Sequence, residues 1–514
     1  MPSRPARNPA TAPVSAVIGV DSSTQSTKAA VVDTATGRLL AVGRAPHTVT
    51  GQGGARESDP EQWWQALRTA VTAALAESGL DPSAVTGIAV AGQQHGLVTL
   101  DADGNPLRPA LLWNDTRSAP QAAALTAALG REGWLDRTGS VPVASMTAAK
   151  WMWLRENEPA NAAATAAVRL PHDFLTERLS GAAVTDPGDA SGTCWYDPAT
   201  QGYDPELLAL TGIRADMLST VAATGATRAG HLTAEAARAL GLPAGIPVAA
   251  GTGDNMAAAV GLGLGAEGLL DHPVVSLGTS GTVFAATRNI PHSPLLADFA
   301  ATDGTRLPLG CTLNCTLAVD KVAELLGLDR EDAVPGGEAV LLPFLDGERT
   351  PDLPAASGLL HGLRHDTTRQ QILGAAYEGA VVAVLRALDE LPLVPGRSTS
   401  APSHEQTVTA AAPDAPDAPL RLIGGGARGT MWVETVRRLS GRAVILPDSA
   451  ELVALGAAAL AAGAATGRDP VALATEWGTG EGRELPAVPR DTATWDRVTA
   501  VLDRATPALL TTHS

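Results

Sequence analysis

The chain has 514 residues, 45% of them hydrophobic, which is enough to build the cores of two to four domains. Its 37 basic and 54 acidic side chains give a net charge of −17, which disfavours nucleic acid and anionic membranes as partners. Three cysteines make no disulfide framework, and no apolar segment predicts a membrane span, so we expect a cytoplasmic protein.

The first predicted element after the lead-in is a β-hairpin. Residues 1–14 are rich in Pro, Ala and Arg and have no signal-peptide core, so we expect them to be disordered. Apolar strands are predicted at 17–20 and 29–33, joined by the polar turn DSSTQSTK. Asp21, at the strand end, could hold hydrated Mg²⁺, and the hydroxyls, amides and Lys28 of the turn could bind phosphate. A ligand-free Asx turn is the alternative.

Three polar motifs follow apolar strands in the first half of the chain. A strand at 87–91 runs into GQQHG, and LLWNDTR places Trp113 where its flat ring could face a sugar. GTGDN follows the strand PVAA and opens an Ala-rich helix. Asp254 in this motif could be a general base or the helix N-cap, and the two roles do not exclude each other. With an ordinary pKa of about 4 it would be ionised at pH 7 but weak as a base.

The hairpin pattern recurs about half a chain later. A strand at 274–277 enters the turn GTSGT, and VFAA leads back out as a strand. This weak internal duplication predicts two similar lobes facing a cleft, with a boundary in the Gly-rich segment 251–268. Glycines allow close approach of a ligand, and the hydroxyls of Thr279 and Ser280 could bind phosphate. A plain hairpin turn is the alternative.

A late Gly-rich loop follows the strand predicted at 420–423. Gly424, Gly426 and Gly429 satisfy GxGxxG, and Asp448 lies about 20 residues further on, so a nicotinamide-dinucleotide site has to be weighed. We reject it because such a site needs a run of βαβ units behind it, and the chain nearly ends here. A nucleotide resting on this loop and on the next helix N-terminus remains plausible.

The motifs of this chain and their order resemble those of the FGGY carbohydrate kinases over about residues 14–463. In chain order they are DSST, GQQHG, LLWNDTR, GTGDN, SLGTSG, FLDGERTP and IGGGAR. The resemblance implies an α/β fold of two ribonuclease-H-like (actin-like ATPase) lobes around a central cleft. The predicted domains are a disordered lead-in at 1–14, an N-terminal sugar-binding lobe at 15–255, a C-terminal nucleotide-binding lobe at 256–480 with a flexible Pro-rich insertion at 392–419, and a C-terminal tail helix at 481–514.

The resemblance also implies roles for individual residues. Asp254 would be the catalytic base, and Asp21 a catalytic carboxylate that holds Mg²⁺ through water. The sugar would be bound by Gln94, His95, Trp113, Asn114, Asp115 and Asn255. ATP would be bound by Thr24, Lys28, Gly278, Thr279, Ser280, Gly424, Gly425, Gly426 and Ala427. One departure is Ser23, where many members of the family have Gly.

Within the family, GQQHG, WNDTR and GERTP are most similar to members that phosphorylate D-xylulose to D-xylulose 5-phosphate with MgATP. Glycerol kinases carry an Arg-Glu pair where this chain has Gln94 and His95. One alternative is a sister kinase acting on ribulose, gluconate or glycerol. Another is an actin-like nucleotide switch, but such a switch has no need of a sugar-directed base. The predicted partners are a small sugar and ATP, with a homodimer as an open possibility.

Overall fold

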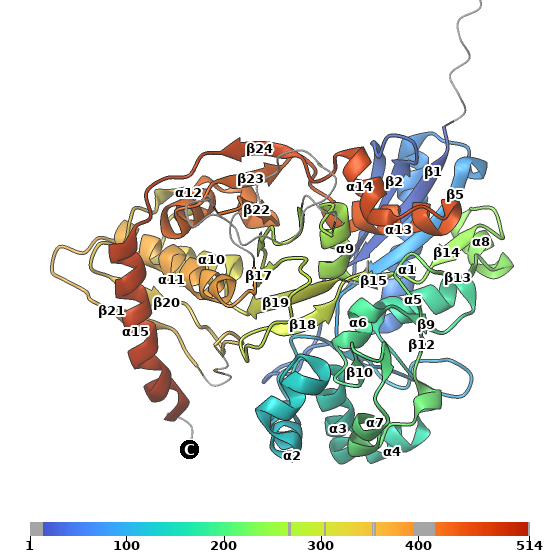
Figure 1. Ribbon diagram of the computed structural model, residues 1–514, viewed down its shortest axis with the longest axis horizontal. Helices are drawn as coiled ribbons and strands as arrows, with labels where there is room; N and C mark the ends of the chain where they lie inside the picture. Colours follow the sequence, from blue (N-terminus) through green and yellow to red (C-terminus); the bar gives the residue numbers. More distant parts are fainter. Residues whose placement is uncertain are drawn as a thin grey trace, which may run out of the picture.

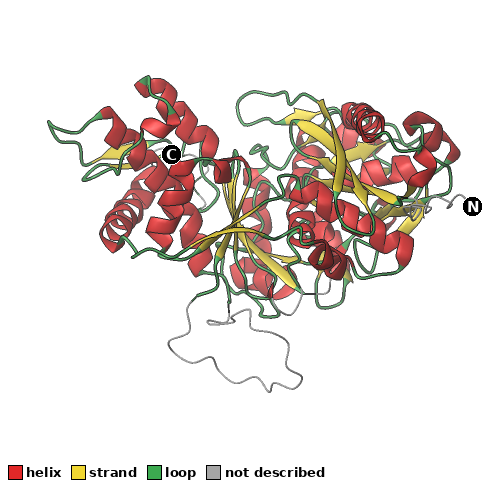
Figure 2. Ribbon diagram, turned by 90° about the horizontal axis from the view of Figure 1, so that it is seen from above, coloured by secondary structure: helices red, strands yellow, loops and turns green. Residues whose placement is uncertain are grey.

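The computed structural model describes residues 14–265, 269–302, 305–351, 353, 356–393 and 417–511. Two α/β lobes lie side by side, each built on a seven-stranded sheet (Figures 1 and 2). The predicted fold class is therefore confirmed. Nearly all of the predicted lead-in, and most of the predicted insertion at 392–419, lie outside the described residues.

The first sheet has the order β13-β14-β5-β1-β2-β3, with β15 also paired to β5. Its strands are β1 (Ala16–Ser22), β2 (Ser26–Asp33), β3 (Leu39–Pro46), β5 (Val85–Gly92), β13 (Arg228–His231), β14 (Pro247–Ala249) and β15 (Thr252–Gly253). Strands β1 and β2 form the predicted hairpin, and β1, β14 and β15 run parallel to β5. Every residue of β1 is buried, because the strand is central and covered on both faces.

The second sheet repeats this plan in the order β18-β19-β17-β16-β22-β23-β24. Its strands are β16 (Val274–Leu277), β17 (Gly281–Phe284), β18 (Ala297–Ala300), β19 (Arg306–Thr312), β22 (Leu420–Ile423), β23 (Val444–Pro447) and β24 (Gly482–Leu485). Strands β16 and β17 form a hairpin as β1 and β2 do, and β16 runs parallel to β22 as β1 does to β5. The carboxyl ends of the parallel strands in both lobes are where polar loops follow, and such ends commonly bind ligands.

Helices cover both sheets. In the first half of the chain they are α1 (Pro60–Ser78), α2 (Ala119–Thr138), α3 (Thr147–Asn157), α4 (Pro159–Ala164), α5 (Pro171–Ser180), α6 (Pro187–Ser191), α7 (Pro205–Thr211), α8 (Ala234–Leu240) and α9 (Asp254–Gly261). In the second half they are α10 (Thr316–Leu326), α11 (Arg369–Asp389), α12 (Thr430–Ser440), α13 (Leu452–Thr466), α14 (Pro470–Trp477) and α15 (Thr492–Thr511). Helix α1 packs on β2 and β3, while α10, α11 and α12 pack around the second sheet.

Helix α13 comes late in the sequence but packs on the first sheet, next to α9 (Figure 1). The approach is close because small residues line it. A Cβ atom at Gly19 of β1 would lie 1.9 Å from the carbonyl oxygen of Ala454. Residues of the second half of the chain therefore complete the core of the first lobe.

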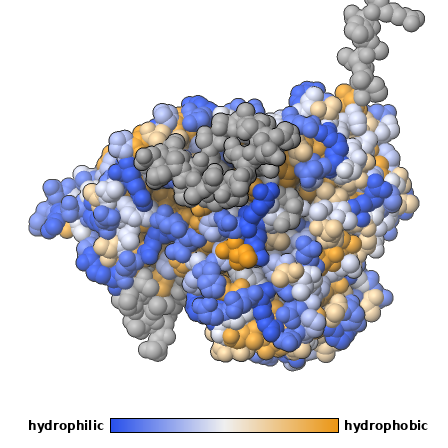
Figure 3. Space-filling model, viewed as in Figure 1, coloured by the Kyte–Doolittle hydropathy of each residue, from blue (hydrophilic) through white to orange (hydrophobic). Residues whose placement is uncertain are grey.

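One helix among the described residues, α11, is long and apolar enough to cross a membrane, but 83% of its apolar window is buried inside the protein. It contributes to the largest core cluster of the second lobe, with Tyr377 packed edge-on against Trp432. Helix α11 is therefore a core helix of the second lobe. On the face seen in Figure 3, hydrophilic residues predominate and hydrophobic ones form small groups.

Candidate active site

A cavity of about 970 Å³ lies between the lobes, at the carboxyl ends of the parallel strands of both sheets. It brings together most of the predicted site residues, from segments far apart in the sequence. Those that line it are Asp21, Thr24, Lys28, Gln94, His95, Trp113, Asn114, Asp254, Asn255, Gly278, Thr279, Ser280, Gly424, Gly425 and Ala427. Two predicted residues, Asp115 and Gly426, do not line it.

Asp21, near the end of β1, lines this cavity. The Ser23 hydroxyl donates a hydrogen bond of 2.5 Å to its carboxylate. The ammonium group of Lys28 lies 3.4 Å from Asp21 and 2.7 Å from Glu451, so it bridges two carboxylates. Burial raises the pKa of Asp21, while the Lys28 charge and the Ser23 hydrogen bond oppose that rise. Ser23 thus fixes the orientation of the carboxylate.

Asp254 is the first residue of α9, and Gly253 before it is the N-cap, so the alternative in which Asp254 caps the helix is not borne out. Its carboxylate accepts hydrogen bonds from the backbone N–H (2.8 Å) and side-chain amide (2.9 Å) of Asn255. The same Asn255 amide donates to the side-chain oxygen of Gln94 at 2.9 Å. One short chain of hydrogen bonds therefore links Asp254 to the GQQHG motif.

The acidity of Asp254 differs from the sequence-based expectation. Burial, and after it the negative charge of Asp21, raises the pKa of Asp254 to about 7. The expected ordinary value is wrong chiefly because the folded chain buries the Asp254 carboxylate, and secondly because β1 brings the Asp21 carboxylate to the same cavity. A carboxylate with a pKa near 7 is a stronger base than an ordinary Asp while still being available at neutral pH.

This pKa predicts a pH dependence of catalysis. If ionised Asp254 is the base, activity needs the deprotonated form, so kcat/KM should rise with pH and level off above about 7. Below that inflection it should fall about tenfold for each pH unit. Initial rates at low concentrations of both substrates report the ionisation of the free enzyme. An inflection near pH 4 would contradict the raised pKa.

Gln94 and His95 follow β5 in a tight, buried turn. The backbone of His95 adopts a φ of +63°, an uncommon conformation for a residue with a side chain and one often found at functional sites. Its ring lies against Gly192, where a Cβ atom would come within 2.3 Å of the imidazole. Burial lowers the pKa of His95 well below its usual value, and the charges of Arg349 and Lys150 add to this. The imidazole is therefore neutral at pH 7 and suited to hydrogen bonding with hydroxyls.

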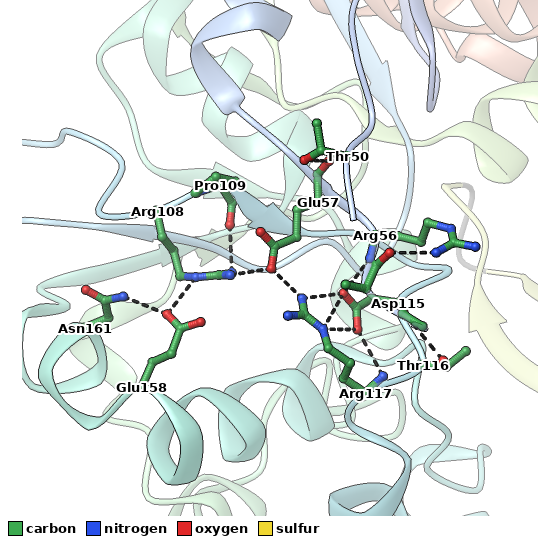
Figure 4. A network of polar contacts seen from close by, with 12 residues as sticks. Thr50, Arg56, Glu57, Arg108, Pro109, Asp115, Thr116, Arg117, Glu158 and Asn161 are labelled. Atoms are coloured by element: carbon green, nitrogen blue, oxygen red, sulfur yellow. Dashed lines mark hydrogen bonds and ion pairs between the residues drawn. The ribbon is translucent and has the colours of Figure 1, made fainter. Parts of the chain in front are cut away.

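Trp113 and Asp115 lie in one loop but differ in the contacts of their side chains. The Trp113 indole donates a hydrogen bond of 3.1 Å to the Thr24 hydroxyl, which ties this loop to the β1–β2 turn. The Asp115 carboxylate is 1% exposed and is held by the Arg117 guanidinium and the Arg56 backbone N–H (Figure 4). Both of its oxygens are thus already hydrogen-bonded, so Asp115 positions the loop that carries Trp113 and Asn114.

The two Gly-rich loops of the second lobe lie against each other. The turn after β16 is held by α10, whose Thr316 hydroxyl donates to the Gly278 carbonyl at 2.8 Å. Gly424, with a φ of +86°, packs on the end of β16, where a Cβ atom would lie 2.7 Å from the Leu277 carbonyl. Gly426 packs on the Leu277 side chain in the same way, which explains why it does not face the cavity.

Several cavity residues were not predicted from the sequence. Glu451 precedes α13 in a segment without a recognisable pattern. Arg349 also lines the cavity and belongs to GERTP, a motif that supports the family resemblance but from which the sequence predicts no site residue. The motif itself was the available signal for Arg349. Phe299 of β18, whose ring centroid is 5.4 Å from that of His95, belongs to no motif at all.

Comparison with known proteins agrees with the family resemblance of the sequence motifs. The model of the N-terminal domain of the FGGY family of carbohydrate kinases matches residues 16–261, and that of the C-terminal domain matches residues 274–465. A xylulose kinase of Streptomyces coelicolor is 56% identical over 96% of this chain and 97% of its own. The Escherichia coli xylulose kinase is 33% identical over 79% of this chain and 81% of its own. The crystal structure of xylulose kinase from Bifidobacterium adolescentis is 32% identical, with a TM-score of 0.74 over 95% of this chain and 99% of its own.

Proposed function

The chain belongs to the FGGY family of carbohydrate kinases, and from this premise we propose that it transfers the γ-phosphate of ATP to O5 of D-xylulose. The product would be D-xylulose 5-phosphate, formed in xylose catabolism. The names of the relatives above and the motifs GQQHG, WNDTR and GERTP support the ketopentose over glycerol, gluconate or ribulose. A cytoplasmic location and a homodimer stay predictions.

One observation carries the proposal. Asp254 lines one cavity together with a polar cluster, to which Asn255 links it, and with two Gly-rich loops of the second lobe. The cluster, with Gln94 and His95, offers hydrogen-bonding groups for sugar hydroxyls. The loops at Gly278 and Gly424 offer backbone amides and space for phosphates. A base between a polyol site and a phosphate site is the arrangement that phosphoryl transfer to a hydroxyl needs.

In the proposed mechanism the sugar hydroxyl attacks the γ-phosphorus in line with the leaving ADP oxygen. Asp254 accepts a hydrogen bond from this hydroxyl and takes its proton as the new oxygen–phosphorus bond forms. Asn255 holds the carboxylate through two hydrogen bonds and links it to Gln94. The orientation of the base is thus coupled to the group that we assign to the sugar.

Asp21 and its neighbours suit a magnesium ion bound through water. The described residues contain no group of three acidic, His or Cys side chains that could hold a metal by themselves, and Mg²⁺ commonly keeps several waters and binds substrate phosphates as well. When bound, the ion would neutralise charge on the phosphates of ATP. Lys28 lies beside Asp21 in the same cavity and would add positive charge there.

The substrate assignment is tested by a coupled assay of ADP formation with purified protein. D-Xylulose should give the highest kcat/KM of a panel that also contains D-ribulose, L-ribulose, gluconate and glycerol. A higher value for another member of the panel would contradict the assignment of D-xylulose as the substrate, but not the membership of the family. ADP formation independent of any sugar would favour the nucleotide-switch alternative.

A substitution at His95 separates sugar recognition from phosphoryl chemistry. His95→Ala should lower kcat/KM for the ketose by about tenfold or more, because a sugar hydroxyl left unpaired in a buried site costs about 1–3 kcal/mol. The KM for ATP should hardly change, because the nucleotide loops come from other segments. Rates at varied sugar and varied ATP measure the two effects.

His95→Gly is the matched control for His95→Ala. Both remove the imidazole, but glycine adopts the φ of +63° without strain, so it should be the more stable of the two by melting temperature. Equal losses of kcat/KM for the ketose in both variants would show that the effect comes from removal of the imidazole ring. If kcat/KM for the ketose falls more in the variant with the lower melting temperature, His95 only shapes the turn.

A further inference from the structure

A second cavity, of about 640 Å³, adjoins the first on the sugar side. The two cavities share five wall residues, namely Trp113, Asn114, Leu309, Cys311 and Arg349. Asp21, Asp254 and the two Gly-rich loops line only the larger one. A sugar whose reacting hydroxyl meets Asp254 and whose other end lies at Trp113 and Asn114 therefore points its far end at the second cavity.

The walls of the second cavity are largely apolar. They come from α2 and the loop after it in the first lobe, and from loops of the second lobe that face them, and include Ala119, Ala122, Val141, Pro142, Leu295 and Leu296. Arg131 and Asp346 are exposed at its rim. Asp115 and Glu348 also line it, but their carboxylates are already hydrogen-bonded within the protein, so sugar hydroxyls would find few partners inside, whereas burial of CH₂ groups there is favourable. The volume lies within the range of about 300–1,000 Å³ that is usual for small-molecule sites.

Arg349 marks the junction of the two cavities. Its loop is held by the buried carboxylate of Glu348, which accepts hydrogen bonds from the backbone N–H groups of Leu313 at 2.5 Å and Asn314 at 3.2 Å. The Arg349 guanidinium faces the Cys311 thiol, and within the described residues no carboxylate forms an ion pair with it. Of the five N–H donors of a guanidinium, those that do not face Cys311 could bind the oxygen atoms at the far end of a bound sugar.

We propose that this kinase also phosphorylates ketopentoses that carry an apolar substituent on C1, with the substituent lying in the second cavity. The inference rests on the proposed function, because transfer to O5 at Asp254 is what directs C1 toward Arg349. The chemistry is the same: the O5–phosphorus bond forms, the bond from phosphorus to the ADP oxygen breaks, and Asp254 takes the hydroxyl proton. The substituent takes no part in the reaction.

The test compares D-xylulose with two ethers of similar length, 1-O-butyl-D-xylulose and 1-O-(2-methoxyethyl)-D-xylulose. The butyl ether should be phosphorylated with a kcat/KM within about tenfold of D-xylulose, and at least about fivefold above the more polar ether, since apolar burial is what the cavity offers. If D-xylulose is phosphorylated and the butyl ether is not, the inference is wrong and the proposed function stands. If D-xylulose itself is not phosphorylated, both are wrong.

Two neighbouring alanines of α2 supply a variant and its control. Ala123 and Ala124 are both exposed, but only Ala123 lines the second cavity. Ala123→Phe should lower kcat/KM for the butyl ether by about tenfold or more and leave D-xylulose within about twofold, because the added ring occupies the space of the butyl group. Ala124→Phe should leave both substrates unchanged. An equal effect of the two variants on the butyl ether would overturn the placement of the substituent.

Discussion

Asp254→Asn should lower kcat by about 10²–10⁴-fold, the range that general-base catalysis contributes in enzymes. Asparagine has nearly the same shape, and its side-chain oxygen can still accept the hydrogen bond from the Asn255 backbone N–H. It cannot take a proton. The melting temperature should not fall, because the change removes a carboxylate that burial and Asp21 disfavour in the folded protein. Turnover under saturating ATP and sugar, with a thermal melt of each protein, measures both effects.

Asp448→Asn is the matched control for this change. Asp448 lines the same cavity and undergoes the same substitution, but it is exposed and lies after β23, on the nucleotide side. Its substitution should change kcat by less than about threefold, because an exposed charge in water contributes little. Near-normal turnover of Asp254→Asn would refute the catalytic role of Asp254.

The second large effect is expected for Asp21→Asn. Loss of this charge should weaken the hold on hydrated Mg²⁺ and its phosphates, and a metal contributes several kcal/mol to transition-state stabilisation, so kcat should fall by about 10²-fold or more. A second readout is independent of the metal. Because the Asp21 charge raises the pKa of Asp254, its removal should shift the acid limb of the pH profile to lower pH.

Ser23→Ala separates the Asp21 charge from its orientation. This variant removes the hydrogen bond to Asp21 and keeps the carboxylate. Because the Asp21 charge is retained, kcat should fall by only about tenfold, the lower end of the 1.5–3 kcal/mol that a hydrogen bond to a charged group contributes, and the acid limb of the pH profile should stay where it is in the wild type. If Asp21→Asn retains more than about a third of the wild-type kcat, Asp21 has no role in the metal site.

The sequence predicted the local elements around the site well, because each depends on a short apolar run and a turn with its own chemistry. The strands at 274–277 and 420–423 form with these boundaries as β16 and β22. The placement of α13 was not predictable in the same way. Its residues, LVALGAAALAAGAAT, are apolar on all sides, so no periodic face indicates which sheet the helix covers.

The candidate site was predicted as a set of residues but not as a set of contacts. A motif identifies Asp115 but does not show that its carboxylate is already hydrogen-bonded to Arg117 and to a backbone N–H. Lys28 was expected to face phosphate, and its bridge to Glu451 depends on a partner from the other end of the chain. The raised pKa of Asp254 likewise depends on Asp21 and on burial, which only the folded chain provides.

The most direct test of the central claim is identification of the product. Purified protein, MgATP and D-xylulose should yield ADP and a single phosphomonoester in equal amounts, and phosphorus–proton couplings in NMR should place the phosphate on C5. The same mixture with Asp254→Asn should yield almost none over the same time. ADP without a sugar phosphate, or phosphate on C1, would contradict the assignment of Asp254 as the base that directs transfer to O5.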